Sequence, residues 1–355
     1  MSLERIHKLV QHDTKPPAPV IELLKKTLIG TEGTLYQLLD TEQKIHSLSE
    51  PHFISIERNG KAIGNVTICK RDILLNGKTA HSLYIRYFAF DTLFQGGSKK
   101  GNSNSNFHAY FKALFETTNM NPVQPQFGKT LYWAFIDPQN LRSFNMNKRF
   151  GFETIGTFTT KAFSRITPKL NGVERLASKD QPEVLSAIQE FYRDYQFFST
   201  VHLFENENYF VLKDKGEIIC GIQANPVHWR IKSLPGFTGK LMLKCAAYIP
   251  GIRKLINPNS YRFLATEGLF WKPGHEDKVA SFLEGVLAAS RHHSLLIWTD
   301  NHNKRLEGLA IRWGLIQKIK KDNPIHIVAR FNDYSSKEID TIRDAPKYLS
   351  GFDMT

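Results

Sequence analysis

Residues 137–153 of the chain read Asp-Pro-Gln-Asn-Leu-Arg-Ser-Phe-Asn-Met-Asn-Lys-Arg-Phe-Gly-Phe-Glu. The residues Asp137-Pro138-Gln139-Asn140 are interpreted as the opening of a short helix. Gly151 is a helix-stop signal, and the apolar run 130–136 reads as a buried strand. The stretch therefore predicts a strand, a short helix and a further strand that begins near Thr154.

Turn signals organise the sequence upstream of this stretch. Asn59-Gly60 predicts a hairpin between strands at 53–57 and 61–69, and Asn76-Gly77 leads into a third strand at 82–90. A polar loop, 95–106, then precedes an amphipathic helix at 107–115. The first 50 residues are predicted to be helical, including the leucine-rich stretch 35–39.

The same order of elements recurs in outline after Val173. It comprises a helix at 182–195, a hairpin at 209–223, strands at 261–269 and 294–299 separated by a helix at 278–290, a helix from Asn303, and a strand at 325–331. Asn303 lies eleven residues before Gly314, as Asn140 lies eleven before Gly151. The repetition predicts a duplicated fold, with domains at 1–170 and 171–355 and an insertion at 229–262.

With these elements in place, the sequence resembles the GNAT superfamily of N-acetyltransferases over about residues 50–165. The spacing from Asn140, through the small Ser143, to Gly151-Phe152 is similar to that family's most specific stretch. The resemblance of the second half is topological. It implies an α/β (α+β) fold of two GNAT-like acyltransferase domains, each a mixed, mostly antiparallel sheet flanked by helices.

The loop after the third strand is the predicted anion site. A strand, a glycine-bearing loop and a helix present backbone N–H groups and the positive helix end to a phosphate. Gly96, Gly97 and Gly101 permit close backbone approach, and 92–115 contains no acidic residue. A solvated surface loop is the alternative. The resemblance implies acetyl-CoA, or another acyl-CoA, held by Phe90, Gly96, Gly97, Ser98, Lys99, Lys100, Gly101, Asn102, Ser103 and Asn140. The loop departs from the family pattern Q/R-x-x-G-x-G/A at its first and last positions.

The resemblance implies N-acetyl transfer to an amine acceptor, and candidate catalytic groups follow from it. Asp91 and Glu57 are the candidate bases. The family's tyrosine, seven residues after the asparagine, is Asn147 here, and an amide is no acid. Tyr132 is the candidate replacement, with Tyr84 and Tyr87 as alternatives. A catalytically inactive binding protein of the same fold is the second interpretation.

The net charge of +13 favours an anionic partner. The insertion 229–262 holds seven basic residues and no acidic one, and the candidates for acceptor contacts are Arg230, Lys232, Lys240 and Lys244. Contact with nucleic acid or an anionic surface, or a helix that covers the second core, are the alternatives. The acidic Glu276-Asp277 pair at the second half's equivalent turn disfavours a second phosphate site, so one cofactor per chain is expected.

Other chemistries lack their motifs. There is no G-x-S-x-G elbow, nucleotide-binding P-loop or dinucleotide fingerprint. His292, His293 and His302 lack acidic or thiol neighbours at metal-ligand spacing. Cys69, Cys220 and Cys245 are far apart, which predicts a reducing compartment, and the cytoplasm is the expected location. No transmembrane segment is expected. The sequence leaves the acceptor, the acyl chain length and the oligomeric state open.

Overall fold

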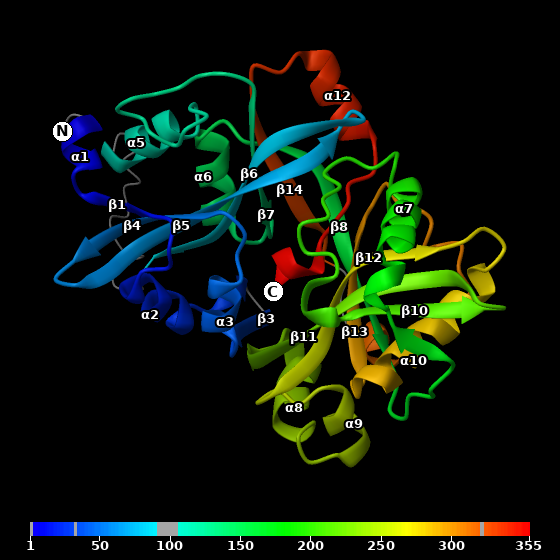
Figure 1. Ribbon diagram of the computed structural model, residues 1–355. Coiled ribbons are helices and arrows are strands. Elements are labelled where there is room, and N and C mark those ends of the chain that lie inside the picture. Colours follow the sequence, from blue (N-terminus) through cyan, green and yellow to red (C-terminus); the bar gives the residue numbers. More distant parts are fainter. Residues whose placement is uncertain (1–2, 32–33, 91–105, 320–322) are drawn as a thin grey trace.

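A computed structural model describes residues 3–31, 34–90, 106–319 and 323–355 of the chain. The first half contains two tight hairpins followed by alternating helices and strands (Figure 1). Its elements are α1 (Leu3–His7), β1 (Val10–Asp13), α2 (Ala18–Lys26), β2 (Ile29–Thr31), β3 (Thr34–Leu38), α3 (Thr41–His46), β4 (Pro51–Arg58), β5 (Lys61–Leu75), β6 (Lys78–Phe90), α5 (Asn106–Leu114), β7 (Thr130–Ile136), α6 (Leu141–Arg149) and β8 (Glu153–Ser164). Both predicted Asn-Gly turns have positive φ at both residues, as a two-residue hairpin turn requires.

The second half repeats the hairpin, helix and strand order. Its elements are β9 (Val173–Arg175), α7 (Gln181–Phe191), β10 (Tyr209–Asp214), β11 (Glu217–Ser233), α8 (Gly236–Cys245), α9 (Pro250–Leu255), β12 (Tyr261–Trp271), α10 (Val279–Ser290), β13 (Ser294–Asp300), α11 (Leu315–Ile319), β14 (Ile325–Asn332) and α12 (Ser336–Asp344). A 3-10 turn, Gly351–Met354, follows. None of the described helices is long and apolar enough to span a membrane.

One continuous sheet joins the two halves. Its described strands run in the order β1-β4-β5-β6-β7-β14-β8-β13-β12-β11-β10-β9, and β3 pairs with β11. The last strand of each half lies in the other half's part of the sheet: β14 pairs with β7, and β8 pairs with β13. This exchange joins the predicted sheets into one. The domain boundary at 170/171 falls between β8 and β9 and stays a prediction.

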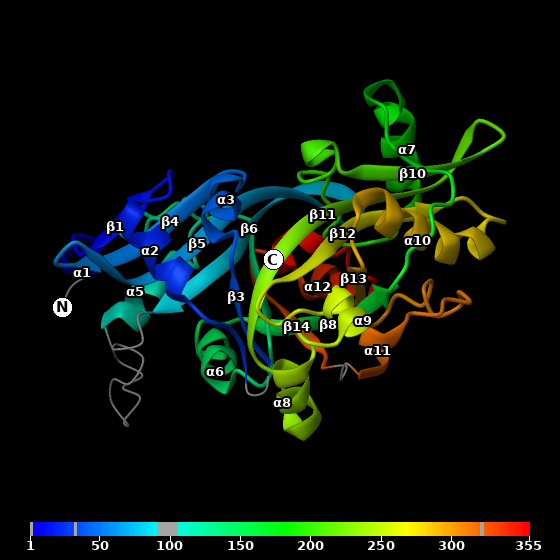
Figure 2. The same cartoon turned by 90° about the horizontal axis from the view of Figure 1, so that it is seen from below.

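Helices cover both faces of the first half's strands (Figure 2). On one face, Tyr110, Phe111 and Leu114 of α5 pack with Leu83 and Tyr132. On the other face, residues of α2 and α3 pack with Phe53 and Ala89. A further core lies between the halves and includes Tyr84 and Trp133 from the first half, and Phe263 and Trp298 from the second.

Two predicted helical regions are wrong. Within the first 50 residues, predicted to be helical, 10–13, 29–31 and 34–38 form strands β1, β2 and β3. Residues 34–38 form β3, because Trp229–Ser233 of β11 offers this stretch a strand edge, and β3 takes it in antiparallel register. Residues 303–314 form turns without a helix, and α11 begins only at Leu315. The spacing from Asn303 to Gly314 therefore does not mark a repeated helix. The duplication is carried instead by the strands.

Candidate functional site

The parallel strands β6 and β7 separate from one another partway along their length. In the described part of the chain they pair only from Ser82 to Tyr84 and from Leu131 to Trp133. Beyond these pairs β6 continues beside β5 as far as Phe90, and β7 continues beside β14. The facing edges therefore present backbone N–H and C=O groups to each other across an opening in the sheet.

A β-bulge explains why β6 leaves its neighbour. Tyr87 and Phe88 together stand opposite Val66 of β5. Tyr87 has a φ of 51°, in the left-handed region, and its carbonyl accepts a hydrogen bond of 3.1 Å from the Asn65 side chain. An extra residue bends a strand and re-aims its backbone. The bend lies at the start of the opening, so the opening is a property of the first half's own backbone.

The second half contains the same irregularity at the equivalent place. In the described chain β12 and β13 pair in parallel only over Leu264–Ala265 and Leu295–Leu296. Gly268, with a φ of 59°, and Leu269 together stand opposite Ile222 of β11. The two halves thus share a separated strand pair and a left-handed bulge residue. This shared detail supports a duplicated fold more directly than the element order does.

Chain segments fill the second opening. The 3-10 turn Gly351–Met354 contacts both β12 and β13, and a Cβ on Gly351 would lie 2.4 Å from the main-chain oxygen of Thr266. The Thr266 hydroxyl donates to the Leu296 carbonyl across the gap at 2.8 Å. The bulge carbonyls of Gly268 and Leu269 accept hydrogen bonds from tyrosine hydroxyls. The second opening is therefore closed by the protein itself.

The residues around this turn form a buried polar centre between the halves, where Figure 1 marks the C-terminus. Both Arg71 Nη atoms donate to the Asp353 carboxylate, at 2.5 and 2.9 Å. The Tyr84 hydroxyl donates to the main-chain oxygen of Asp353, and His202 lies 3.1 Å from Arg71. Burial alone would raise the pKa of Asp353, but the charge and hydrogen bonds of Arg71 lower it. Asp353 is therefore held as a carboxylate.

Two further cations contact the last described residue. Arg86 donates to the main-chain oxygen of Thr355, and Lys44 Nζ donates to its hydroxyl at 3.0 Å. Burial lowers the pKa of Lys44 to about 8, and the nearby Arg86 charge acts in the same direction. Lys44 and Arg86 also lie over the ring of Phe352. The first half thus holds residues 352–355 by charge and aromatic contacts.

A carboxyl group from the second half completes the polar centre. Glu267 is buried, which raises its pKa, and its Oε2 lies 3.5 Å from the Tyr348 hydroxyl. Its Oε1 has no hydrogen-bond partner among the described residues. The cavity beside it measures ≈ 10 Å³, about the least that holds one water molecule. The polar centre therefore ties the halves together and has no room for a substrate.

The structure describes the residues that flank the predicted cofactor loop, and not the loop itself. Asp91, Gly96, Gly97, Ser98, Lys99, Lys100, Gly101, Asn102 and Ser103 lie outside the described residues. Phe90 ends β6 beside the opening and packs over Gly64. A helix does follow 137–140, and Asn140 is its N-cap, since its side chain accepts from Ser143 N at 3.1 Å. Asn147 donates to the Ser143 carbonyl.

The structure does not bring together Tyr132 and Glu57, the two predicted catalytic residues that it describes. Tyr132 is fully buried, and its hydroxyl donates to the carbonyls of Leu114 and Thr117. Its hydrogen bonding is satisfied within the core, which gives it a packing role that conflicts with proton donation to a substrate. Glu57 lies near the end of β4, opposite Ala62 and away from the opening by the width of β5.

The four predicted acceptor-binding cations lie on the insertion. Arg230 and Lys232 are exposed on the end of β11, and Lys240 and Lys244 are exposed on α8. Arg230 pairs through its backbone with Gln37 of β3. These side chains form a basic outer surface of the second half and do not line the polar centre.

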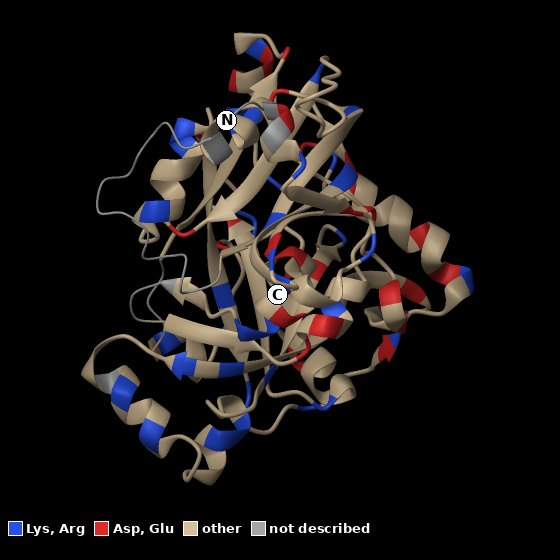
Figure 3. Cartoon of the chain, turned by 90° about the vertical axis from the view of Figure 1, so that its left-hand side faces the viewer, with Lys and Arg blue, Asp and Glu red and all other residues tan. Residues whose placement is uncertain are grey.

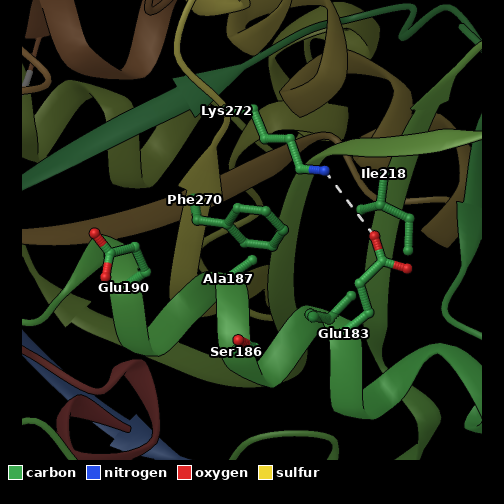
Figure 4. A pocket seen from close by; sticks show the side chains of 8 residues that line it. Glu183, Ser186, Ala187, Glu190, Ile218, Phe270 and Lys272 are labelled. Carbon is green, nitrogen blue, oxygen red and sulfur yellow. Dashed lines mark ion pairs between the residues drawn. The ribbon is translucent and has the colours of Figure 1, made fainter.

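An open hollow of ≈ 340 Å³ lies between α7 and strands β11 and β12 of the second half (Figure 4). Ile218 and Phe270 form its apolar floor. Glu183 and Glu190 stand at its rim, and Lys272 lies 4.0 Å from Glu183 and 2.6 Å from Glu217. Among the residues that line the hollow, Lys272 is the only cation, and these two carboxylates neutralise its charge. The hollow therefore does not suit a phosphate-rich ligand.

Solved structures share this architecture. The chain aligns with Saccharomyces cerevisiae N-myristoyltransferase bearing myristoyl-CoA and inhibitors, with a TM-score of 0.56 and 10% identity over 91% of this chain and 80% of that one. A second structure of the yeast enzyme with myristoyl-CoA gives 0.56 and 8% identity, over 95% and 84%. The chain has a tandem GNAT fold.

An Anabaena variabilis GCN5-related N-acetyltransferase aligns with a TM-score of 0.48 and 11% identity, over 90% of this chain and 72% of that one. Comparison of the sequence with protein-family models and with curated proteins gives no match. The likeness to the two yeast structures, at 8–10% identity, is therefore one of fold.

Proposed function

We propose that this chain is an acyl-CoA-dependent N-acyltransferase whose acyl-CoA lies in the opening between β6 and β7. The observation that carries this proposal is the asymmetry of the two openings. The second is filled by the turn Gly351–Met354, whereas the first is bordered by backbone edges and by the strand that leads to the glycine-bearing loop. The yeast N-myristoyltransferase structures carry myristoyl-CoA, which supports this donor class.

The opening supplies part of what acyl transfer requires. Beyond the bulge at Tyr87, β6 is no longer paired with β7 in the described chain. A backbone N–H group fixed at this edge would stabilise the negative charge that develops on a thioester oxygen. Anchoring the donor's phosphates by the loop 96–103 remains a prediction, as does Asp91 as the base. Within the donor class we propose acetyl-CoA first, and an amine as the acceptor.

The test begins with calorimetry of acetyl-CoA and longer acyl-CoAs. Gly101→Glu adds a carboxylate to the predicted phosphate loop and should abolish binding. Pro273→Glu adds the same carboxylate to the exposed turn after β12 and should leave binding unchanged. Equal affinities in the two variants would place the phosphates elsewhere, and a wild-type chain that binds no acyl-CoA would overturn the proposal. Release of free thiol in the presence of an amine panel then tests transfer.

The second candidate is a binding protein that keeps the fold without the chemistry. Position 147 favours it, because the family's proton donor is replaced by an amide that donates to its own helix, and the predicted substitute Tyr132 is fully buried. This candidate predicts acyl-CoA binding without thiol release on any amine.

A further inference from the structure

The connection between β11 and β12 differs from its counterpart in the first half. There, β5 and β6 are joined by the tight turn Asn76-Gly77. In the second half the equivalent strands are joined by residues 234–260, which form α8 and α9. These helices project from the lower end of the molecule in Figure 1. Since the first half forms the same strand pair without them, the sheet does not require this excursion.

Helix α8 presents apolar side chains on two faces. On the inner face, Met242, Leu243 and Ala246 pack against the core between the halves. On the outer face, at helical spacing, Phe237 is 81% and Leu241 51% exposed. Just beyond the helix, Tyr248 is 84% exposed and Ile249 is also exposed. The inner face anchors the excursion, so the outer side chains are displayed on a fixed helix.

Four exposed cations lie on α8 and α9, the helices that carry or flank these outer side chains. Lys240 and Lys244 are exposed beside Phe237 and Leu241 on α8, and Arg253 and Lys254 are exposed on α9. Residues 218–266 include no aspartate or glutamate. Figure 3 shows Lys and Arg, without Asp or Glu, on the helices at its lower end. We call the eight residues Phe237, Lys240, Leu241, Lys244, Tyr248, Ile249, Arg253 and Lys254 the α8–α9 patch.

We propose that the α8–α9 patch docks the protein on an anionic phospholipid bilayer. Lysine and arginine attract acidic headgroups, while phenylalanine, tyrosine, leucine and isoleucine beside them enter the headgroup and acyl boundary. A nucleic acid would satisfy the cations and could stack on the aromatic rings, but it offers no apolar medium for Leu241 and Ile249. The combination therefore favours lipid. This inference is independent of the proposed acyl transfer.

Vesicle co-sedimentation tests the proposal with the full chain. The wild type should bind phosphatidylcholine vesicles that contain phosphatidylglycerol, bind pure phosphatidylcholine far more weakly, and be released by salt. Phe237→Ser with Tyr248→Ser should weaken binding by at least about tenfold, since it removes two apolar groups from the bilayer. Lys240→Gln with Lys244→Gln should weaken it by about tenfold as well.

Matched controls lie elsewhere on the surface. Phe127→Ser removes another exposed phenylalanine, and Lys61→Gln with Lys78→Gln removes two cations from hairpin ends. Both should bind vesicles as the wild type does. No binding to the phosphatidylglycerol vesicles, or equal losses in patch and control variants, would overturn the proposal. The proposal would also be overturned if the chain bound an oligonucleotide but no vesicles, and if Lys240→Gln with Lys244→Gln abolished that binding.

Discussion

Arg86 and Glu267 occupy equivalent positions in the two halves, each one residue before the bulge of its strand, and both contact the C-terminal segment. Arg86 donates to the main-chain oxygen of Thr355, and Glu267 lies 3.5 Å from the hydroxyl of Tyr348. The two equivalent positions thus carry side chains of opposite charge type, an arginine and a carboxyl group. The segment between them is held by the first half and fills the opening of the second, so one feature both joins the halves and makes them unequal.

We expect one acyl-CoA molecule per chain. The turn Gly351–Met354 leaves no space for a ligand beside Thr266, whereas β6 and β7 are not paired with each other beyond Tyr84 and Trp133 in the described chain. Calorimetric titration with acetyl-CoA measures the stoichiometry. A value of two would show that the C-terminal segment leaves the second opening.

Arg71→Met should lower the free energy of unfolding by about 3 kcal/mol, because it leaves the Asp353 carboxylate buried without its main partner. The side chains of Arg71 and Asp353 are 5% and 1% exposed. Urea unfolding measures the loss. Lys129→Met breaks the exposed ion pair with Glu338 and should cost at most about 1 kcal/mol. Similar losses in both variants would mean that the buried pair contributes no more than a surface pair.

Lys44→Met should change how stability depends on pH. In the folded chain the pKa of Lys44 is about 8, below the ordinary 10.5. Between pH 8 and 10.5, Lys44 is therefore protonated in the unfolded chain and largely neutral in the folded chain. The wild type should therefore gain stability as pH rises from about 8 to 10.5, by about 3 kcal/mol from this group.

The Lys44→Met variant should lack this rise and be the more stable of the two near neutral pH. Lys61→Met, at an exposed hairpin position, is the control and should follow the wild type. The test is to measure the free energy of unfolding of the wild type and both variants across this pH range. Parallel curves for wild type and Lys44→Met would show that the lysine is not desolvated in solution.

Local signals predicted the first half's core elements well. Asn59-Gly60, Asn76-Gly77 and Asn140 fix turns and a helix start through their own side chains and backbone, so no distant partner is needed. The strand β3 and the exchange of β8 and β14 depend on edges supplied from far along the chain. Periodicity in a short window carries no information about such partners.

The polar centre was missed for the same reason. Arg71 and Asp353 are 282 positions apart, and neither belongs to a motif. One signal was present: Cys69, Arg71 and Ile73 alternate on one face of β5, and all three are buried. An arginine at an inward position of an apolar strand predicts a buried anion, although it does not name one. The sequence contains no comparable signal for the separation of β6 from β7.

The left-handed bulge in the second half offers a test of the duplicated backbone. Gly268 has a φ of 59°, and a Cβ there would lie 2.7 Å from Leu203 Cδ2. Gly60, in a hairpin turn, has a φ of 70° with nothing within 4 Å of its added Cβ. Both Gly→Ala changes incur the left-handed penalty of about 1–2 kcal/mol. Only Gly268→Ala adds overpacking, which costs about 1–3 kcal/mol more. Urea unfolding should therefore rank Gly268→Ala below Gly60→Ala in stability. Equal losses would indicate that Leu203 moves freely aside, and a Gly268→Ala variant as stable as the wild type would contradict the bulge itself.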